Sequence, residues 1–294
     1  MLSSYIIGCK VQYLLNVEQY EFVQFHPSYD YTDFVEGLRP IQNGSNIVFE
    51  RKDGIFKEFC KNAAKAEIED KKNDKKKFVF VIDEINRGEI SKIFGELFFS
   101  IDPGYRGEFD KDGMSNRIKT QYQNLIENKS NKEKGNTDNS SSASSSSDED
   151  FSKGFYVPSN VYVIGTMNDI DRSVESMDFA FRRRFSFVEV TASESESMLY
   201  NSDGWDDEKT NNAINRMQKL NAAIIDPQIG GLTDQYQIGG AYFLKLAKLD
   251  FDFERLWREN LRGILYEYFR GQPNALEIIN KLKDAYDLKD DVKK

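Results

Sequence analysis

The chain has 294 residues, of which 40 are lysine or arginine and 49 aspartate or glutamate, giving a formal net charge of -9. This length suits one large domain or two smaller ones, and the negative charge argues against a protein that coats nucleic acid through its overall field. Cys9, Cys60 and the single histidine, His26, show no metal-ligand spacing, so we expect a reducing compartment and no structural zinc. No apolar run approaches the roughly 20 residues that span a bilayer, so we expect a soluble cytoplasmic protein with no membrane partner.

The first predicted element is a short strand over residues 21–26, which Pro27 closes. An aromatic and acidic segment follows it as far as Gly37. His26 has no partner histidine or cysteine, and we interpret it as structural. Residues 71–77 are mostly lysine and predict a solvated charge run ahead of the next strand.

The most informative stretch is the apolar run 78–82, which ends in Asp83 and Glu84. Five consecutive apolar residues suit a strand buried on both faces of a parallel sheet, and the carboxyl ends of such strands carry ligands. Asp83 would then hold Mg²⁺ through its water shell, and Glu84 would polarise the attacking water of a nucleotide hydrolase. A buried strand that meets solvent in an Asp-Glu turn gives the same local pattern, so the downstream motifs must decide.

An amphipathic helix and a polar insertion follow this strand. Apolar residues recur at steps of three and four between Ile90 and Ile101, which predicts one helix that stops at Pro103 and Gly104. From about 108 to 153 polar and charged residues dominate and end in a serine run. Such a composition buries too little apolar surface to order itself, so we predict a disordered insertion.

A second apolar strand is predicted over residues 160–168, and it ends in Asn168. A short helix over 173–184 and a strand over 185–190 are expected next. The later pattern is helical, with apolar positions recurring between 214 and 225 and between 253 and 269. We therefore predict an incomplete α/β nucleotide-hydrolase core over residues 1–192 and a helical domain over 193–294.

Two buried strands that end in Asp83-Glu84 and Asn168, followed by Arg182, Arg183 and Arg184, fit an oligomeric phosphate-hydrolysing motor. An amide at a strand tip can orient water toward a γ-phosphate, and a guanidinium from a neighbouring subunit can neutralise charge in the transition state. The plainer readings are that Asn168 caps a turn and that the arginines form a solvated helix end.

The sequence also resembles a known family, the McrB family of AAA+ NTPases, which are motor subunits of modification-dependent restriction systems. The blocks that carry the likeness run from about Val23 to Phe269, excluding the serine-rich insertion, and they are QFHPSYDYTDFVEG, IDEINR, SKIFGEL, VPSNVYVIGTMNDIDRS, MDFAFRRRF and QIGGAYFL. The DEINR block is shared with other AAA+ clades, including metal-chelatase-like motors. The Asn-x-x-Asp-Arg-Ser block with the triple arginine is far more specific.

The resemblance implies an α/β AAA+ P-loop NTPase-like parallel sheet, truncated at its amino-terminal side, followed by a small helical lid domain. It assigns Asp83 and Glu84 to the Walker B pair, Asn168 to the sensor asparagine, and Asp171 and Arg172 to the family signature. The arginine finger would lie among residues 182–184. It further implies Mg²⁺, ATP or GTP as substrate, a homo-oligomeric ring or a hetero-oligomer with other AAA+ subunits, a McrC-like nuclease subunit, and DNA as an indirect partner.

Two departures from the family stand out. Gly240 and Ala241 occupy the positions of a histidine and a serine in the family's usual IGHSYF block, which argues against nucleotide sensing from there. No GxxxxGK[ST] phosphate loop occurs in these 294 residues, so we expect a fragment or a split protein. The main function hypothesis is an NTPase that drives DNA translocation. The alternative is a catalytically silent assembly subunit that supplies an arginine finger to a neighbour, and a metal-chelatase-type motor is a third, weaker idea.

Overall fold

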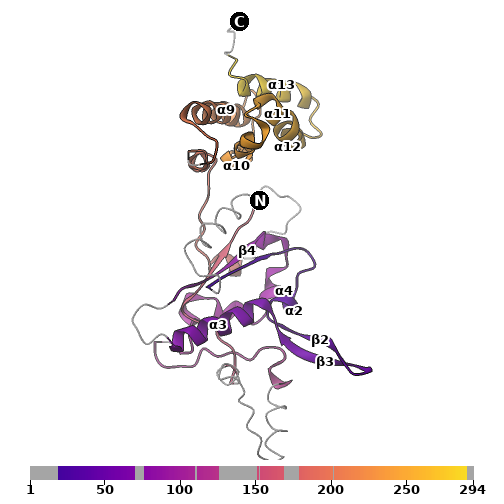
Figure 1. Cartoon of the computed structure of the whole chain (residues 1–294), viewed down its shortest axis with the longest axis vertical. Helices are drawn as coiled ribbons and strands as arrows, with labels where there is room; N and C mark the ends of the chain where they lie inside the picture. Colours follow the sequence, from indigo (N-terminus) through magenta and orange to yellow (C-terminus); the bar gives the residue numbers. More distant parts are fainter. Residues whose placement is uncertain are drawn as a thin grey trace, which may run out of the picture. The chain divides into compact units, whose positions relative to one another are not determined.

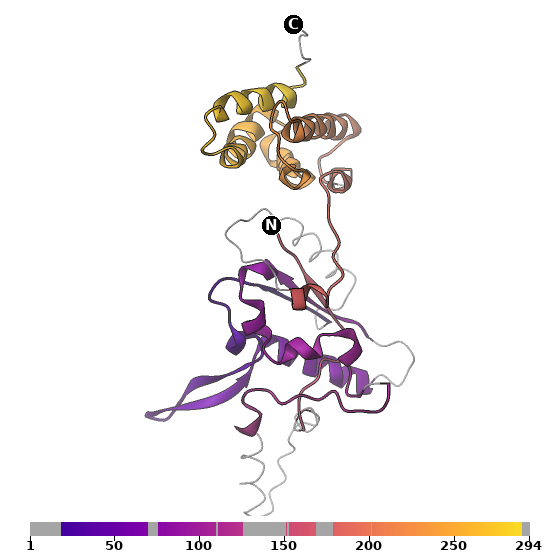
Figure 2. The same cartoon turned by 180° about the vertical axis from the view of Figure 1, so that it is seen from behind.

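The computed structural model describes residues 19–69, 76–109, 111–125, 151, 153–168, 179–200 and 202–289 (Figures 1 and 2). These residues form two compact units, one that extends to Ser186 and one that begins at Phe187. We describe each unit by itself. In the described part of the chain, no helix combines the length and the apolar character needed to cross a bilayer.

The first unit is built on a parallel sheet of three described strands in the order β1-β4-β5. Their bounds are β1 (Tyr20–Gln24), β4 (Phe78–Asp83) and β5 (Val161–Gly165). The register places Gln24 opposite Asp83 and Ile82 opposite Gly165. The two strands predicted to end in polar residues are therefore neighbours and run in the same direction, as an α/β fold requires.

One face of this sheet is covered by helices α2 (Tyr31–Phe34), α3 (Ile55–Glu69), α4 (Ile90–Phe94) and α5 (Leu97–Ser100). Aromatic rings dominate the core between them. Phe34 stacks on Phe56 with centroids 4.7 Å apart, and Phe56 meets Phe80 of β4 edge-on at 5.0 Å. All three rings are fully buried, and such pairs add to the free energy gained from burying their area.

A β-hairpin that the sequence analysis did not predict lies between α2 and α3. Its strands are β2 (Glu36–Asn43) and β3 (Asn46–Asp53), and they pair antiparallel along their whole length. Gly44 has a φ of +63° in the turn, a conformation that glycine adopts at little cost. Both views show the hairpin extending away from the helices (Figures 1 and 2).

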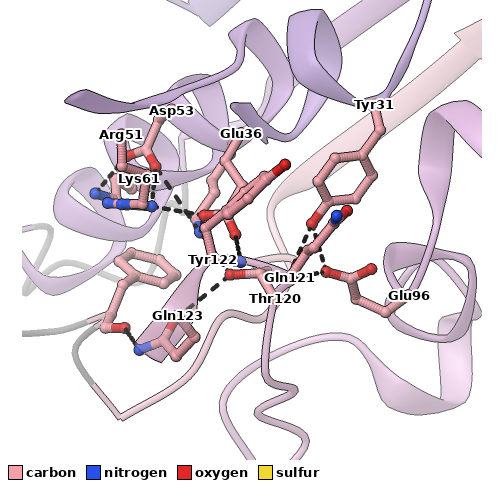
Figure 3. A network of polar contacts seen from close by, with 12 residues as sticks. Tyr31, Glu36, Arg51, Asp53, Lys61, Glu96, Thr120, Gln121, Tyr122 and Gln123 are labelled. Atoms are coloured by element: carbon pink, nitrogen blue, oxygen red, sulfur yellow. Dashed lines mark hydrogen bonds and ion pairs between the residues drawn. The ribbon is translucent and has the colours of Figure 1, made fainter. Parts of the chain in front are cut away.

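Buried charges fix the base of this hairpin to the core (Figure 3). The side chain of Glu36 is fully buried and accepts hydrogen bonds from Lys57 Nζ at 2.6 Å, from Arg51 Nη1 at 2.6 Å and from the Tyr122 amide at 2.7 Å. Lys57 Nζ also donates to Thr120 Oγ1 at 3.0 Å. The network thus joins β2, β3, α3 and the segment around residue 120.

Three details differ from the sequence-based expectations. The helix predicted over 90–101 is interrupted at Gly95, whose φ is +50° and where a Cβ would come within 2.9 Å of the Tyr31 ring. Residues 186–190 form no regular secondary structure and pair with no described strand, so the strand predicted over 185–190 is wrong in the described structure. Of the helix predicted over 173–184, the structure describes α8 (Phe179–Arg182).

Residues 111–125, which composition placed in the disordered insertion, make specific contacts with the core. The backbone of Ile118 bridges to Phe155, and Arg117 donates to Glu108 at 2.8 Å. Thr120 and Gln123 are buried. Composition underestimated this segment because polar side chains order it through hydrogen bonds rather than through apolar area. The serine run lies outside the described residues.

The second unit is helical, as predicted. Its elements are η4 (Glu194–Met198), α9 (Asp207–Ile225), η5 (Asp234–Tyr236), α10 (Gly240–Phe243), η6 (Leu244–Leu249), α11 (Phe253–Leu256), the π-helical turn η7 (Trp257–Leu261), α12 (Arg262–Tyr268) and α13 (Ala275–Tyr286). Asp206 caps α9 by accepting from the Lys209 amide at 2.8 Å. Tyr286 is buried in the core, and its hydroxyl donates to the Phe253 carbonyl at 2.9 Å. A separate apolar core therefore supports this unit.

Candidate nucleotide-hydrolysis site

Polar side chains gather where the three parallel strands end. Gln24 is the last residue of β1, Asp83 is the last of β4, and Thr166 directly follows β5. Glu84 and Asn168 continue the chain beyond β4 and β5. The backbone holds these turns together, because the Ile85 amide donates to the Thr166 carbonyl at 2.9 Å. The structure therefore brings Asp83, Glu84 and Asn168 to one edge of the sheet.

The Asp83 carboxylate has a hydrogen-bond donor on each oxygen. Gln24 Nε2 donates to Oδ2 at 3.0 Å, and Thr166 Oγ1 donates to Oδ1 at 2.7 Å. Asp83 is only 5% exposed. An ionised carboxylate accepts at both oxygens and has further lone pairs to spare, so the two contacts leave room for water ligands.

Glu84 combines burial with a left-handed backbone. Its φ and ψ are 52° and 46°, which for a residue with a Cβ costs on the order of 1–3 kcal/mol and recurs at functional sites. The residue is 3% exposed. Asn168 Nδ2 donates to Oε1 at 3.2 Å, and Arg87 Nε lies 3.3 Å from Oε2. The Glu84 carboxylate is thus held between Asn168 and Arg87.

Asn168 is exposed, and from beyond the end of β5 it faces Glu84 beyond the end of β4. Its backbone carbonyl accepts a long hydrogen bond, 3.4 Å, from Asn86 Nδ2. The predicted pairing of a carboxylate and an amide at one strand edge is therefore present in the structure. The turn-capping reading of Asn168 does not account for its contact with Glu84 across the sheet.

The three arginines of the predicted finger segment differ in their surroundings. Arg182 and Arg183 are exposed at the end of α8. The Arg184 guanidinium lies 4.3 Å from the centre of the Phe98 ring, donates to the Ala180 carbonyl and approaches Asp102 at 3.9 Å. Arg184 is therefore engaged inside its own unit. Asp171 and Arg172 lie outside the described residues.

The donor set decides which metal this edge could hold. Among the described residues, no three histidine, cysteine, aspartate or glutamate side chains converge. Glu84, the residue next to Asp83, has a buried Oε2 atom that accepts no hydrogen bond and has the Arg87 guanidinium 3.3 Å away as an ion pair. Mg²⁺ keeps several waters and takes one or two carboxylates, so the residues fit a water-mediated magnesium site and not an all-protein cage.

Comparison with known protein families agrees with this geometry. Residues 9–185 match the AAA domain of the dynein-related subfamily, and residues 212–277 match the alpha-helical lid domain of McrB. The chain belongs to the McrB-type AAA+ proteins of the dynein-related subfamily. The parallel sheet with its three described strands and the helical unit are accordingly an AAA core and an McrB lid.

Two relatives of the chain are components of restriction enzymes. It is 39% identical over 188 residues to the Type IV methyl-directed restriction enzyme EcoKMcrB subunit of Escherichia coli strain K12, which covers 63% of this chain and 32% of the relative. It is 24% identical over 311 residues to the Type II restriction enzyme BsuMI component YdiS of Bacillus subtilis strain 168, which covers 92% of this chain and 77% of the relative. The match thus spans about a third of the length of the first relative.

Sequence reasoning missed three residues of the candidate site, Gln24, Arg87 and Thr166, and it noted the departure at Gly240 without its packing reason. The three site residues show their relevance only once the strand register is known. Gly240 departs from the family's usual block for a packing reason. Its amide donates to Ser195 Oγ at 2.8 Å, and a Cβ there would lie 2.4 Å from the Ser195 carbonyl oxygen. A side chain at this position therefore requires a different packing of η4 on α10.

Proposed function

We propose that this AAA+ chain binds ATP or GTP with Mg²⁺ at the carboxyl ends of β4 and β5 and hydrolyses it to drive DNA translocation in a restriction system. The observation that carries the proposal is the contact between Glu84 and Asn168, beside an Asp83 carboxylate held by two donors. A carboxylate pair and an amide on adjacent strand ends are the groups that nucleotide hydrolysis needs to hold a metal and orient water.

Each side chain has a distinct task in this proposal. Asp83 accepts hydrogen bonds from the metal's water ligands, Glu84 takes a proton from the attacking water, and Asn168 orients that water. Mg²⁺, when bound, would neutralise charge on the β- and γ-phosphates. Asn168 Nδ2 donates to Oε1 of Glu84 and Arg87 Nε lies 3.3 Å from Oε2, and a carboxylate oxygen with one such contact still has a lone pair for the water's proton. We assign nucleotide contacts also to Asp171 and Arg172, from the family signature.

The proposed motor works as a ring. We propose that the finger lies among Arg182, Arg183 and Arg184, of which Arg182 and Arg183 are exposed and Arg184 contacts the Phe98 ring. A guanidinium from one subunit would then stabilise the transition state in the next. A McrC-like nuclease subunit and, through the assembly, DNA are the proposed partners.

The test of the motor is the Glu84→Gln variant. Loss of a general base lowers the rate by about 10²–10⁴-fold, so we expect steady-state turnover of ATP or GTP to fall within that range while nucleotide binding persists. Glu89→Gln is the matched control, because Glu89 is exposed in the same turn and pairs with Lys92. Turnover that is the same in Glu84→Gln and wild type rejects the assignment.

The exposed pair Arg182 and Arg183 also favours a second candidate, a subunit that binds no nucleotide and serves only its neighbour. Equilibrium dialysis with labelled ATP and GTP separates the two candidates. Micromolar binding to the isolated chain counts against the silent subunit. Absence of binding, together with loss of a neighbouring subunit's turnover in Arg182→Ala or Arg183→Ala, supports it.

A further inference from the structure

We propose that Gln24 and Thr166 are positioning residues that hold the Asp83 carboxylate in the orientation it needs to meet the water shell of Mg²⁺. The inference rests on the proposed function and adds two residues to its machinery. Both residues lie inside sequence blocks that resemble the family, but the resemblance assigned no role to either of them.

The strand register places the three side chains in one row. Gln24 pairs with Asp83 across β1 and β4, and Ile82 pairs with Gly165 across β4 and β5, so Thr166 lies opposite Asp83 on the other side. Paired residues of parallel strands point to the same face of a sheet. The row lies on the face opposite the aromatic core, to which Phe80 and Ile82 belong.

The two donors act on different oxygens of one carboxylate. The terminal torsion of an aspartate is broad, so a free carboxylate samples many orientations. Gln24 Nε2 at 3.0 Å from Oδ2 and Thr166 Oγ1 at 2.7 Å from Oδ1 fix the plane of the group from both sides. A site whose ligands are oriented in advance loses less conformational freedom when the metal binds.

A merely structural role would link the strands instead of orienting Asp83. The strands are already joined by their backbone ladders, and the Thr166 amide donates to the Ile82 carbonyl at 2.9 Å. Loss of a side-chain donor that served only the sheet would lower stability and leave the magnesium dependence of turnover unchanged. The dependence on Mg²⁺ therefore distinguishes the two roles.

The experiment is a Mg²⁺ titration with two readouts, the binding of labelled ATP or GTP in equilibrium dialysis and the turnover of saturating nucleotide. Thr166→Val and Gln24→Met keep the shape of each side chain and remove its donor. We expect the Mg²⁺ concentration for half-maximal binding and for half-maximal turnover to rise about tenfold in each variant, equivalent to about 1.4 kcal/mol, with less than about a threefold change in maximal turnover. Thr166→Ser restores the hydroxyl and should lie close to wild type.

Thr233→Val and Gln228→Met are matched controls, because both positions are exposed in the helical unit. An unchanged Mg²⁺ dependence in Thr166→Val and Gln24→Met overturns the positioning role while the proposed function stands. A wild-type chain without turnover overturns the proposed function and this inference with it. If Thr166→Val does not fold, as judged by circular dichroism, Gln24→Met alone decides the question by the same criterion.

Discussion

The buried ion pair between Lys57 and Glu36 gives the sharpest prediction about stability. The side chain of Lys57 is 1% exposed and that of Glu36 is fully buried, and their contact is 2.6 Å. Removing one partner of a buried pair costs about 3–5 kcal/mol, because the other charge stays buried without compensation. Since a domain's stability is about 5–15 kcal/mol, either truncation removes a large part of it.

The polar partners that remain in each variant determine which of the two loses more stability. In Lys57→Met, Glu36 still accepts from Arg51 and from the Tyr122 amide (Figure 3), so we expect a loss near the lower end, about 3 kcal/mol. In Glu36→Leu, Lys57 keeps Thr120 and an Asp53 oxygen at 3.8 Å, so we expect a loss near the upper end, about 5 kcal/mol. Lys52→Met, exposed on the same hairpin, should change stability by less than about 0.5 kcal/mol.

Urea denaturation followed by two probes measures this effect. Both tryptophans, Trp205 and Trp257, lie in the helical unit, so their fluorescence reports on that unit, while the far-ultraviolet circular dichroism also reports on the core. The variants should shift the dichroism transition of the core and leave the fluorescence transition in place. The reasoning is refuted if Glu36→Leu costs no more than Lys52→Met.

The same pair predicts acid sensitivity. Burial alone would raise the pKa of Glu36, but the charge and hydrogen bond of Lys57 and the Tyr122 amide outweigh it and hold the pKa below its ordinary value of 4.5. A carboxyl with a lowered pKa in the folded state contributes stability that is present above the unfolded value and is lost as the pH falls through the folded value. As the pH falls below about 5, the free energy of unfolding of the core should therefore decrease less in Lys57→Met than in wild type. The same urea denaturation, repeated at each pH, measures this difference.

Three further predictions concern other parts of the chain. Gly240→Ala should destabilise the helical unit by about 1–3 kcal/mol, seen in tryptophan fluorescence, because its Cβ would meet the Ser195 carbonyl, whereas Gly263→Ala in α12 has open space and should not destabilise it. Burial raises the pKa of the Cys60 thiol and shields it from reagents. In a Cys9→Ser background, a thiol reagent should therefore modify Cys60 at least about a hundredfold more slowly in the native chain than in urea. Equal rates in the two conditions contradict the prediction. Arg184→Ala should destabilise the core by about 0.5–2 kcal/mol through loss of its contact with the Phe98 ring, and Arg183→Ala should not, as urea denaturation would show.

The sequence predicted the parts of the fold that depend on periodicity and on apolar runs. Residues 78–82 read correctly as a buried strand, and the run that ends in Asn168 read correctly as its neighbour in an α/β sheet. The helical character of the second unit followed from apolar spacing at three and four residues. Each of these signals lies within a short stretch of sequence, and the structure has the predicted element at each of these stretches.

The hairpin of β2 and β3 was missed although the two-residue turn Gly44-Ser45 is a local hairpin signal, because the strands on either side of it show no clear alternation. Its strands carry an exposed apolar face that includes Ile47 and Phe49, so alternation with polar residues is weak. The hairpin is held instead at its base, where Glu36 meets Lys57 from a helix that follows 21 residues later. No window of sequence shows that a glutamate and a lysine at this separation are both fully buried.

The candidate site departs from local rules where its chemistry lies. A glutamate in the left-handed region contradicts ordinary backbone preference, and Glu84 adopts it with its carboxylate buried between Asn168 and Arg87. Natural sequences break such rules mainly at functional or strained positions. The same residue, Glu84, contacts Asn168 beyond the end of β5, so the left-handed backbone and the carboxylate that we assign to water activation occur at one position.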